Sequence, residues 1–305
     1  MDKIKLVVIL GATASGKSKL ALDLAALFSG EIISADSMQV YKHMDIGTAK
    51  PSRAERAAIP HHLIDVVEPD EEFTAASFRQ EASRRMEEIR ARGRNPFVAG
   101  GTGLYIRALT KGIFEGPEGD KTVRDDLLRE AQLYGRASLY EKLKEADPVS
   151  AERIHPNNLR RVVRALEVYY LARRPISDFH REHAFAERPY DTLFIGLEKE
   201  RGRLYEDIDQ RVDEMMERGL VDETRGLLEM GYSPDLKPMG ALGYKEVVAF
   251  LKGETTLDEA TRLIKRNTRH YAKRQITWFR KDPEIRWFPP EERSGIIGEV
   301  KGHLG

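Results

Sequence analysis

The chain has 305 residues, of which 41% are hydrophobic and 33% are charged. Its 50 basic and 50 acidic residues give a formal net charge of zero, so any nucleic-acid ligand would need a local basic surface. The absence of cysteine excludes disulfides, thiolate metal sites and cysteine nucleophiles, and is compatible with a reducing compartment.

The first hundred residues alternate between patterns typical of strands and helices. Residues 4–10 form a continuous apolar run, as expected for a strand buried on both faces, and residues 16–28 repeat apolar positions at helical spacing. Further strands are expected at 31–36, 62–67 and 95–101, with a helix over 74–92. This alternation predicts an α/β fold with a parallel sheet and right-handed crossovers.

The pattern changes near "GPEGD", residues 116–120. Residues 116–189 contain helical segments and no convincing strand, and "ERPYDTLFIGL" (187–197) restores a strand. We therefore predict a helical insertion, 116–189, within an α/β core formed by 1–115 and 190–305. The core should continue with helices at 200–218, 219–230, 240–251 and 256–281, and end in a loosely ordered tail.

Nothing in the chain indicates a membrane protein. The apolar start is only about seven residues long, too short for a signal peptide or a membrane span, and no other stretch is apolar enough. We predict a cytoplasmic protein without a membrane partner. A monomer is favoured, because no exposed apolar seam is evident.

The stretch "GATASGKS" follows the first strand and opens the first helix. It fits the phosphate-binding pattern G-x-x-x-x-G-K-[ST] at every fixed position. Backbone N–H groups and the positive helix end would face one phosphate, Lys17 would add charge, and the Ser18 hydroxyl would bind Mg²⁺. The alternative is a glycine-rich turn without ligand. The predicted phosphate site comprises Gly11, Ala12, Thr13, Ala14, Ser15, Gly16, Lys17 and Ser18.

Asp36 directly follows the second strand. It should therefore lie at the carboxyl edge of the sheet, beside the phosphate loop, where ligands bind in open α/β folds. The alternative on position alone is that Asp36 caps a turn or supplies a second acid for Mg²⁺. The strand that ends in "FVAGG" is followed by Thr102, whereas ATPases and GTPases usually place an acid near such a position. This weakens a hydrolase interpretation, although Asp65 could substitute.

Lys and Arg gather in two local clusters, although the net charge of the chain is zero. Residues 262–281 carry Lys and Arg without any acid, and Arg262, Arg266, Arg269 and Lys273 recur along one helical stripe. The plainer alternative is a solvated face. A second cluster, "RRVVR" at 160–164, lies in the insertion. Both are local basic surfaces of the kind that a nucleic-acid ligand would need.

Three stretches in order, "GATASGKS", "ADSMQVYKHMDIGTAKP" and "AGGTGLY", resemble the tRNA dimethylallyltransferases, also called tRNA isopentenyltransferases. "HPNNLRRVVRALEVY", "RVDEMMERGLVDE", "GALGYKE" and "TRHYAKRQITWFR" extend the resemblance over nearly the whole chain. It implies a P-loop NTPase-like core in which the loop holds dimethylallyl diphosphate instead of ATP. The implied reaction moves the dimethylallyl group to N6 of the adenosine next to the anticodon on its 3′ side, with Mg²⁺ assisting.

The resemblance also implies roles for individual residues. Asp36 becomes the general base, Arg211 a stabiliser of the leaving diphosphate, and Thr13 and Thr102 further contacts to diphosphate or base. The adenine must leave its stack to reach Asp36. The residues that would contact the tRNA anticodon stem-loop are Asp36, Ser37, Met38, Gln39, Thr102, Arg124, Arg160, Arg161, Val162, Val163 and Arg164.

Two rivals remain open from the sequence. A P-loop nucleotide or small-molecule kinase would bind ATP in the same loop, but does not explain the acid-free basic run. A non-catalytic RNA-binding protein with a nucleotide switch does not explain Asp36 beside an intact loop.

Overall fold

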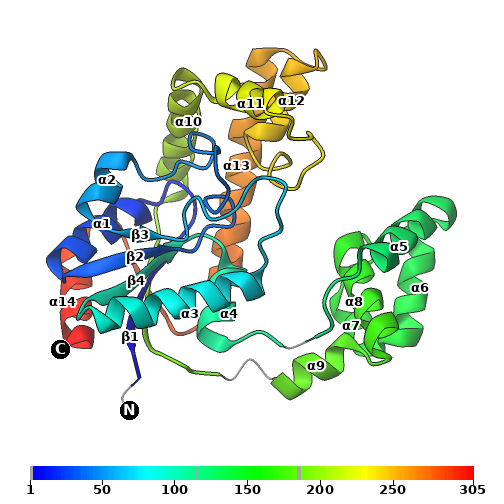
Figure 1. Ribbon diagram of the computed structural model, residues 1–305, viewed down its shortest axis with the longest axis horizontal. Coiled ribbons are helices and arrows are strands. Elements are labelled where there is room, and N and C mark those ends of the chain that lie inside the picture. Colours follow the sequence, from blue (N-terminus) through cyan, green and yellow to red (C-terminus); the bar gives the residue numbers. More distant parts are fainter. Residues whose placement is uncertain (1–2, 115, 184–186) are drawn as a thin grey trace. The chain divides into compact units, whose positions relative to one another are not determined.

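The computed structural model describes residues 3–114, 116–183 and 187–305. Its centre is a six-stranded sheet of order β3-β2-β4-β1-β5-β6, in which every neighbouring pair is parallel (Figure 1). The predicted α/β fold class is thereby confirmed. The strands are β1 (Lys5–Gly11), β2 (Gly30–Ser34), β3 (His61–His62), β4 (Asn95–Gly100), β5 (Asp191–Leu197) and β6 (Ile285–Phe288).

Helices cover both faces of this sheet. On one face α1 (Lys17–Leu27) and α14 (Arg293–Leu304) contact the central strands, and on the other α3 (Ala75–Ala91) and α13 (Leu257–Phe279) do so. β1 serves both cores, because its successive side chains point to opposite faces. The other helices of this part are α2 (Arg53–Ala58), α4 (Gly103–Lys111), α10 (Arg201–Glu217), α11 (Leu220–Glu229) and α12 (Tyr244–Leu251).

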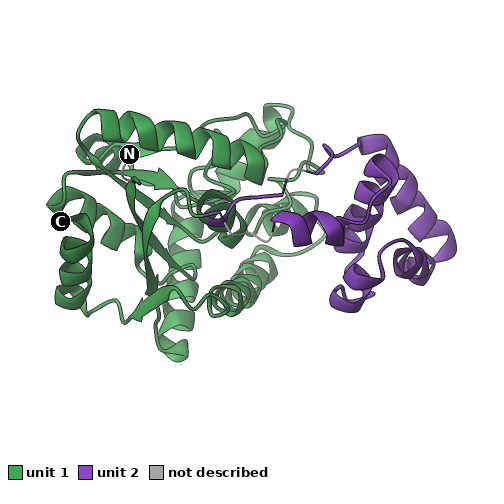
Figure 2. Ribbon diagram, turned by 90° about the horizontal axis from the view of Figure 1, so that it is seen from below, with its two compact units in different colours: residues 1–110, 188–305 green, residues 111–187 purple. Residues whose placement is uncertain are grey.

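The chain divides into two compact units, residues 1–110 with 188–305 and residues 111–187 (Figure 2). The second unit is helical and has its own hydrophobic core, which includes Leu139, Leu143 and Leu166. The sequence predicts 116–189 for this insertion, so both boundaries differ by a few residues. Its helices are α5 (Lys121–Tyr134), α6 (Arg136–Ala146), α7 (Pro148–Arg153), α8 (Leu159–Ala172) and α9 (Ile176–His183).

The strand predicted at 62–67 is wrong over most of its length. β3 ends at His62, since Leu63 and Asp65 have positive φ angles of 61° and 54°, which interrupt extended backbone. Val67 still forms an isolated parallel bridge with Tyr41. The segment after β3 therefore continues as a loop, which forms backbone hydrogen bonds with residues 39–42.

The predicted loose tail is also wrong. β6 extends the sheet beside β5, and α14 packs against β1 and β5 with Ile296 and Val300 fully buried. Arg293 at the start of α14 forms an ion pair with Asp23 of α1, with a 2.6 Å separation. Three glycines within the helix had obscured its pattern in the sequence.

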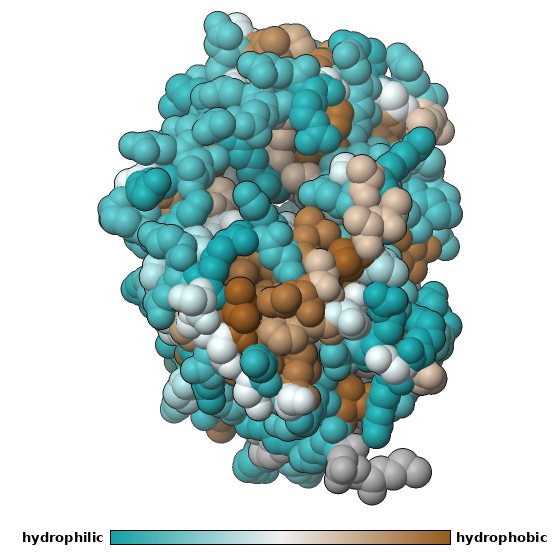
Figure 3. All heavy atoms as spheres, turned by 90° about the vertical axis from the view of Figure 1, so that its left-hand side faces the viewer, coloured by the Kyte–Doolittle hydropathy of each residue, from teal (hydrophilic) through white to brown (hydrophobic). Residues whose placement is uncertain are grey.

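One face of the protein shows how polar and apolar side chains are distributed. Figure 3 shows one face, on which hydrophilic side chains surround a hydrophobic patch. Across the part of the chain that the structure describes, no helix combines the length and apolar character needed to cross a bilayer.

The burial of α14 gives a stability test. Truncating Ile296 to alanine would leave a cavity against β1 and β5, so we expect Ile296→Ala to lower the free energy of unfolding by about 2–5 kcal/mol. Chemical denaturation measures this change, with Lys301→Ala on the exposed side of α14 as a near-neutral control. An unaltered denaturation midpoint for Ile296→Ala would show that α14 does not complete the core.

Candidate active site

The loops that follow β1, β2 and β4 meet at the carboxyl edge of the sheet, where two adjoining cavities of about 360 Å³ each open. The phosphate-loop cavity is lined by residues of the 11–18 loop, and the apolar cavity lies toward α10, α13 and the start of α12. Residues common to both linings are Thr13, Asp36, Thr48, Arg211 and Tyr271. A ligand that spans both cavities would therefore pass Asp36 and Arg211.

The phosphate loop has the geometry that the sequence motif requires. Gly16 has a φ of 90°, which favours glycine, and α1 begins directly after it at Lys17. The Lys17 ammonium donates to the Ala12 carbonyl at 3.1 Å. Of the predicted phosphate residues, Thr13, Ala14, Gly16, Lys17 and Ser18 line the cavity. Gly11, Ala12 and Ser15 are buried and form its support.

Gln275 of α13 lines the phosphate-loop cavity and ties the phosphate loop to the loop that follows β4. Its carbonyl accepts the N–H of Thr13 at 2.9 Å, and its amide donates to the Gly101 carbonyl at 2.9 Å. Gln275 thus joins the loops that follow β1 and β4 through one buried side chain. Lys199 adds a second support, donating to the Ala14 carbonyl at 3.3 Å.

Asp36 is half-buried and oriented by its own loop. Its Oδ1 atom accepts the N–H of Met38 at 2.8 Å and, more weakly, that of Gln39 at 3.4 Å. The Thr102 hydroxyl accepts the N–H of Ser37 at 3.0 Å, and the Thr102 N–H donates to the Ala35 carbonyl at 3.1 Å. Thr102 is not among the described residues that line the two cavities. It therefore supports the loop of Asp36 instead of facing the cavities.

Positive charge gathers around Asp36. Burial, the nearby Arg211 guanidinium and, in the opposite direction, Asp36 set the pKa of Lys17 at about 8. Burial also lowers the pKa of Arg211, which nevertheless stays charged at neutral pH. Burial and the Asp36 charge raise the pKa of Tyr271 to about 12, so its hydroxyl stays protonated and can donate. This arrangement suits a polyanion on one side and a proton acceptor on the other.

The apolar cavity has a different chemistry. Met38, Val212, Met215, Leu242, Tyr244 and Ile264 line it, with Lys245 and Arg274 as basic members. Such a lining accommodates a flat or apolar group while its basic side chains favour an attached phosphate. Ser37 and Met38 contribute to this cavity and Gln39 to the phosphate-loop cavity, which places the three predicted base contacts around Asp36.

The predicted magnesium site is consistent with these residues. Ser18 lines the phosphate-loop cavity together with Asp36, Asp207 and Glu214. Among the described residues no group of three His, Cys, Asp or Glu side chains is placed to hold a metal. Mg²⁺ commonly takes one or two protein oxygens and fills its shell with water and substrate phosphate. A Ser18 hydroxyl and a diphosphate fit that mode.

The residues of the insertion that are predicted to contact RNA differ in how exposed their side chains are. Arg124 and Arg164 both pair with Glu167, which is fully buried, at 3.1 and 2.8 Å, and remain 43% and 38% exposed. Arg160 and Arg161 are exposed at the start of α8. The side chains of Val162 and Val163 are buried in the core of the insertion, so the RNA contact predicted for these two residues would have to use their main-chain atoms.

Acidic residues that lie outside 262–281 pair with part of the basic run of α13. Arg269 pairs with Asp209 of α10 at 2.5 Å, and Arg262 pairs with Glu259 one turn earlier at 2.6 Å. Although residues 262–281 contain no acid, part of their positive charge is therefore balanced by acidic residues elsewhere in the chain. Lys273 and Arg274, toward the C-terminal end of the helix, are exposed, and Arg274 also lines the apolar cavity.

Comparison with known proteins identifies the family. A model described as IPP transferase matches residues 39–282. The chain belongs to the IPP transferase family. The family assignment made from the sequence is confirmed, and so is its P-loop-like fold.

Relatives match over nearly the full length. The chain is 55% identical to tRNA dimethylallyltransferase 2 of Geotalea uraniireducens, covering 98% of this chain and 97% of that protein. It is 54% identical to tRNA dimethylallyltransferase of Geobacter sulfurreducens, covering 94% and 92%.

Solved structures agree. The full-length tRNA isopentenylpyrophosphate transferase of Bacillus halodurans matches with a TM-score of 0.74 and 43% identity, covering 99% of this chain and 97% of that one. A eukaryotic dimethylallyltransferase described as acting on tRNA matches with a TM-score of 0.82 and 32% identity, covering 99% and 77%.

Sequence reasoning assigned no role to Gln275 or Tyr271, although both lie in the quoted basic run. A signal was present: the buried stripe of α13 runs through Ile264, Ala272 and Phe279, and Gln275 occupies that stripe as a polar residue. A buried amide requires partners, which indicates a structural tie or a ligand.

The lowered pKa of Lys17 predicts a pH-dependent affinity. The protonated form attracts diphosphate, so affinity should fall as pH rises through about 8. Since one proton is involved, we expect the Kd of dimethylallyl diphosphate to be about tenfold weaker at pH 9 than at pH 7. Isothermal titration calorimetry measures this, and Lys17→Met should flatten the dependence. An equally steep dependence in Lys17→Met would assign the titration to another group.

Proposed function

We propose that this protein transfers a dimethylallyl group from dimethylallyl diphosphate to N6 of the adenosine 3′-adjacent to the anticodon, in tRNAs that read codons beginning with U. The observation that carries the proposal is the pair of adjoining cavities in a member of this family, both of which are lined by Thr13 of the phosphate loop and by Asp36. The similarity to proteins named tRNA dimethylallyltransferase supplies the class of substrates.

The diphosphate end of the donor binds in the phosphate-loop cavity. As the allylic C–O bond breaks, negative charge grows on the leaving diphosphate. Loop N–H groups, Lys17 and Arg211 stabilise that charge in a partly enclosed site, where such interactions are strong. When bound at Ser18, Mg²⁺ adds further charge stabilisation.

The acceptor adenine enters through the apolar cavity after leaving its base stack. Its N6 atom is a weak nucleophile, because its lone pair is delocalised into the ring. Asp36 takes the N6 proton as the new N–C bond forms, so the products are prenylated adenosine and diphosphate. Met38 and Gln39 donate their backbone N–H groups to one oxygen of Asp36, which leaves its other oxygen for this task.

The RNA backbone would be held by Arg124, Arg160, Arg161 and Arg164 of the insertion and by the exposed end of α13. The monomeric state and the cytoplasmic location stay predictions within this proposal. No observation favours the kinase alternative.

The deciding experiment incubates the protein with radiolabelled dimethylallyl diphosphate, Mg²⁺ and unmodified tRNA. Label should enter the tRNA at a single adenosine, identified by nuclease digestion. Consumption of ATP with a small acceptor and no labelled tRNA would support the kinase instead.

Asp36 provides the sharpest mutational test. Asp36→Asn keeps the size of the side chain and removes its basicity, so we expect kcat to fall about 10²–10⁴-fold. The Kd of dimethylallyl diphosphate, measured by calorimetry, should stay close to that of the unmodified protein. Transfer at the normal rate would show that another group accepts the proton.

Arg160 and Arg161 test the RNA contact. Replacing both by alanine should raise KM for tRNA without lowering kcat, and each lost phosphate contact should reduce the slope of log affinity against log salt by about 1. Arg129→Ala, at an exposed position of α5, is the matched control in the insertion. Equal salt slopes for all three proteins would place the tRNA elsewhere.

A further inference from the structure

Glu223 of α11 binds a loop that is distant in sequence. Its Oε2 atom accepts the N–H groups of Asp45 and Ile46 at 2.8 and 2.7 Å, and its Oε1 atom accepts that of Gly47 at 3.1 Å. The Tyr244 hydroxyl donates to Oε1 at 2.6 Å. Four donors thus converge on one carboxylate, and hydrogen bonds to an ionised acceptor are stronger than neutral ones.

The loop that contains Gly47 packs tightly against Tyr244 of α12. The Tyr244 ring is fully buried, and a Cβ atom on Gly47 would lie 2.5 Å from it. Gly47 and Tyr244 both line the apolar cavity, whereas Glu223 is not among the lining residues. Glu223 therefore fixes one wall of the cavity from behind.

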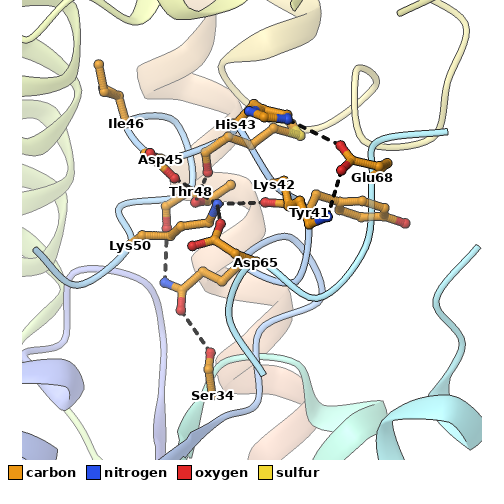
Figure 4. A network of polar contacts seen from close by, with 12 residues as sticks. Ser34, Tyr41, Lys42, His43, Asp45, Ile46, Thr48, Lys50, Asp65 and Glu68 are labelled. Atoms are coloured by element: carbon orange, nitrogen blue, oxygen red, sulfur yellow. Dashed lines mark hydrogen bonds and ion pairs between the residues drawn. The ribbon is translucent and has the colours of Figure 1, made fainter. Parts of the chain in front are cut away.

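The same loop is connected to Asp36 through Gln39. The Gln39 amide donates to the carbonyls of Thr48 and Ala49, both at 3.2 Å, and its carbonyl accepts the Ser34 hydroxyl at 2.8 Å. Figure 4 shows this connection between the end of β2 and the loop. Because the Gln39 backbone N–H points to Asp36, a shift of residues 45–49 would reach the carboxylate.

Lys50 anchors the far end of the loop. Its buried ammonium donates to the Tyr41 carbonyl at 2.6 Å and pairs with Asp45 and Asp65 at 2.8 and 2.5 Å (Figure 4). Lys50 uses partners within residues 41–65, so it holds the loop to its own neighbourhood. Glu223 holds the loop to the C-terminal helices that complete the apolar cavity.

We propose that Glu223 is a positioning residue for transfer to the acceptor adenine. By fixing residues 45–47, Glu223 fixes the position of the carbonyls that follow them, those of Thr48 and Ala49, which orient the Gln39 side chain. Gln39 in turn orients Asp36. It also holds Gly47 against Tyr244 and so keeps the shape of the cavity wall. This inference rests on the proposed function and adds a residue that touches neither substrate.

Glu223→Gln tests the proposal, because an amide can accept from only one side and presents its NH₂ group to the loop donors. A displacement of the base by a fraction of an ångström to 1 Å lowers the rate steeply, so we expect kcat for tRNA prenylation to fall about 10–100-fold. The Kd of dimethylallyl diphosphate should not change, since Gln275 and Lys199 hold the phosphate loop independently. Glu229→Gln, exposed on the same helix, should behave as the unmodified protein.

A double-mutant cycle separates positioning from mere stability. If Glu223 acts through Gln39, the Glu223→Gln/Gln39→Ala double variant should be no slower than the slower single variant. All rates are measured well below the melting temperature of each variant. Should Glu223→Gln fold poorly, Tyr244→Phe removes one donor and leaves the three backbone bonds, and should lower kcat less but in the same direction.

A normal kcat for a folded Glu223→Gln protein would overturn the proposal, as would independent effects of Glu223 and Gln39 that multiply in the double variant. Failure of the unmodified protein to prenylate tRNA would refute the proposed function itself. An active unmodified protein with an unaffected Glu223→Gln variant would refute only the positioning role.

Discussion

Parallel pairing of the strands is the constraint on which the site depends. Because β1, β2 and β4 run in the same direction, the loops after them emerge at one edge of the sheet. This brings the phosphate loop, Asp36 and Thr102 together although they are far apart in the sequence. The final alignment comes from a few bonds between side chains and backbone, above all those of Gln275, which joins two of the three loops.

The electrostatics of the site follow from that proximity. Lys17 and Arg211 are buried close enough to lower the affinity of Lys17 for its proton, and Asp36 partly opposes this. A diphosphate that enters would relieve the repulsion between the two cations. As the diphosphate leaves after bond cleavage, the same cations would again lie unscreened, so they favour retention of the anion over its loss. The positive groups that assist cleavage therefore also tend to slow product release.

Much of the core could be predicted from sequence, because its signals are local. The run 4–10, the phosphate motif and the alternation of strands and helices each lie within a short window. Asp36 was found because it follows a strand directly. Gln275 and Glu223 were not assigned, since their roles depend on partners far along the chain, at Gly101 and at residues 45–47. The burial of Val163 likewise depends on how α8 packs within the insertion, which the basic pentapeptide alone does not reveal.

β6 and α14 close the sheet from a distance in the chain. Four helices, α10 to α13, separate β5 from β6, yet β6 pairs with β5 and α14 packs on β1 and β5. A folding intermediate in which β1 to β5 had assembled without α14 would expose the apolar side chains that Ile296 and Val300 cover in the native protein. Such a surface favours aggregation, so the speed at which this late contact forms would affect the yield of folded protein.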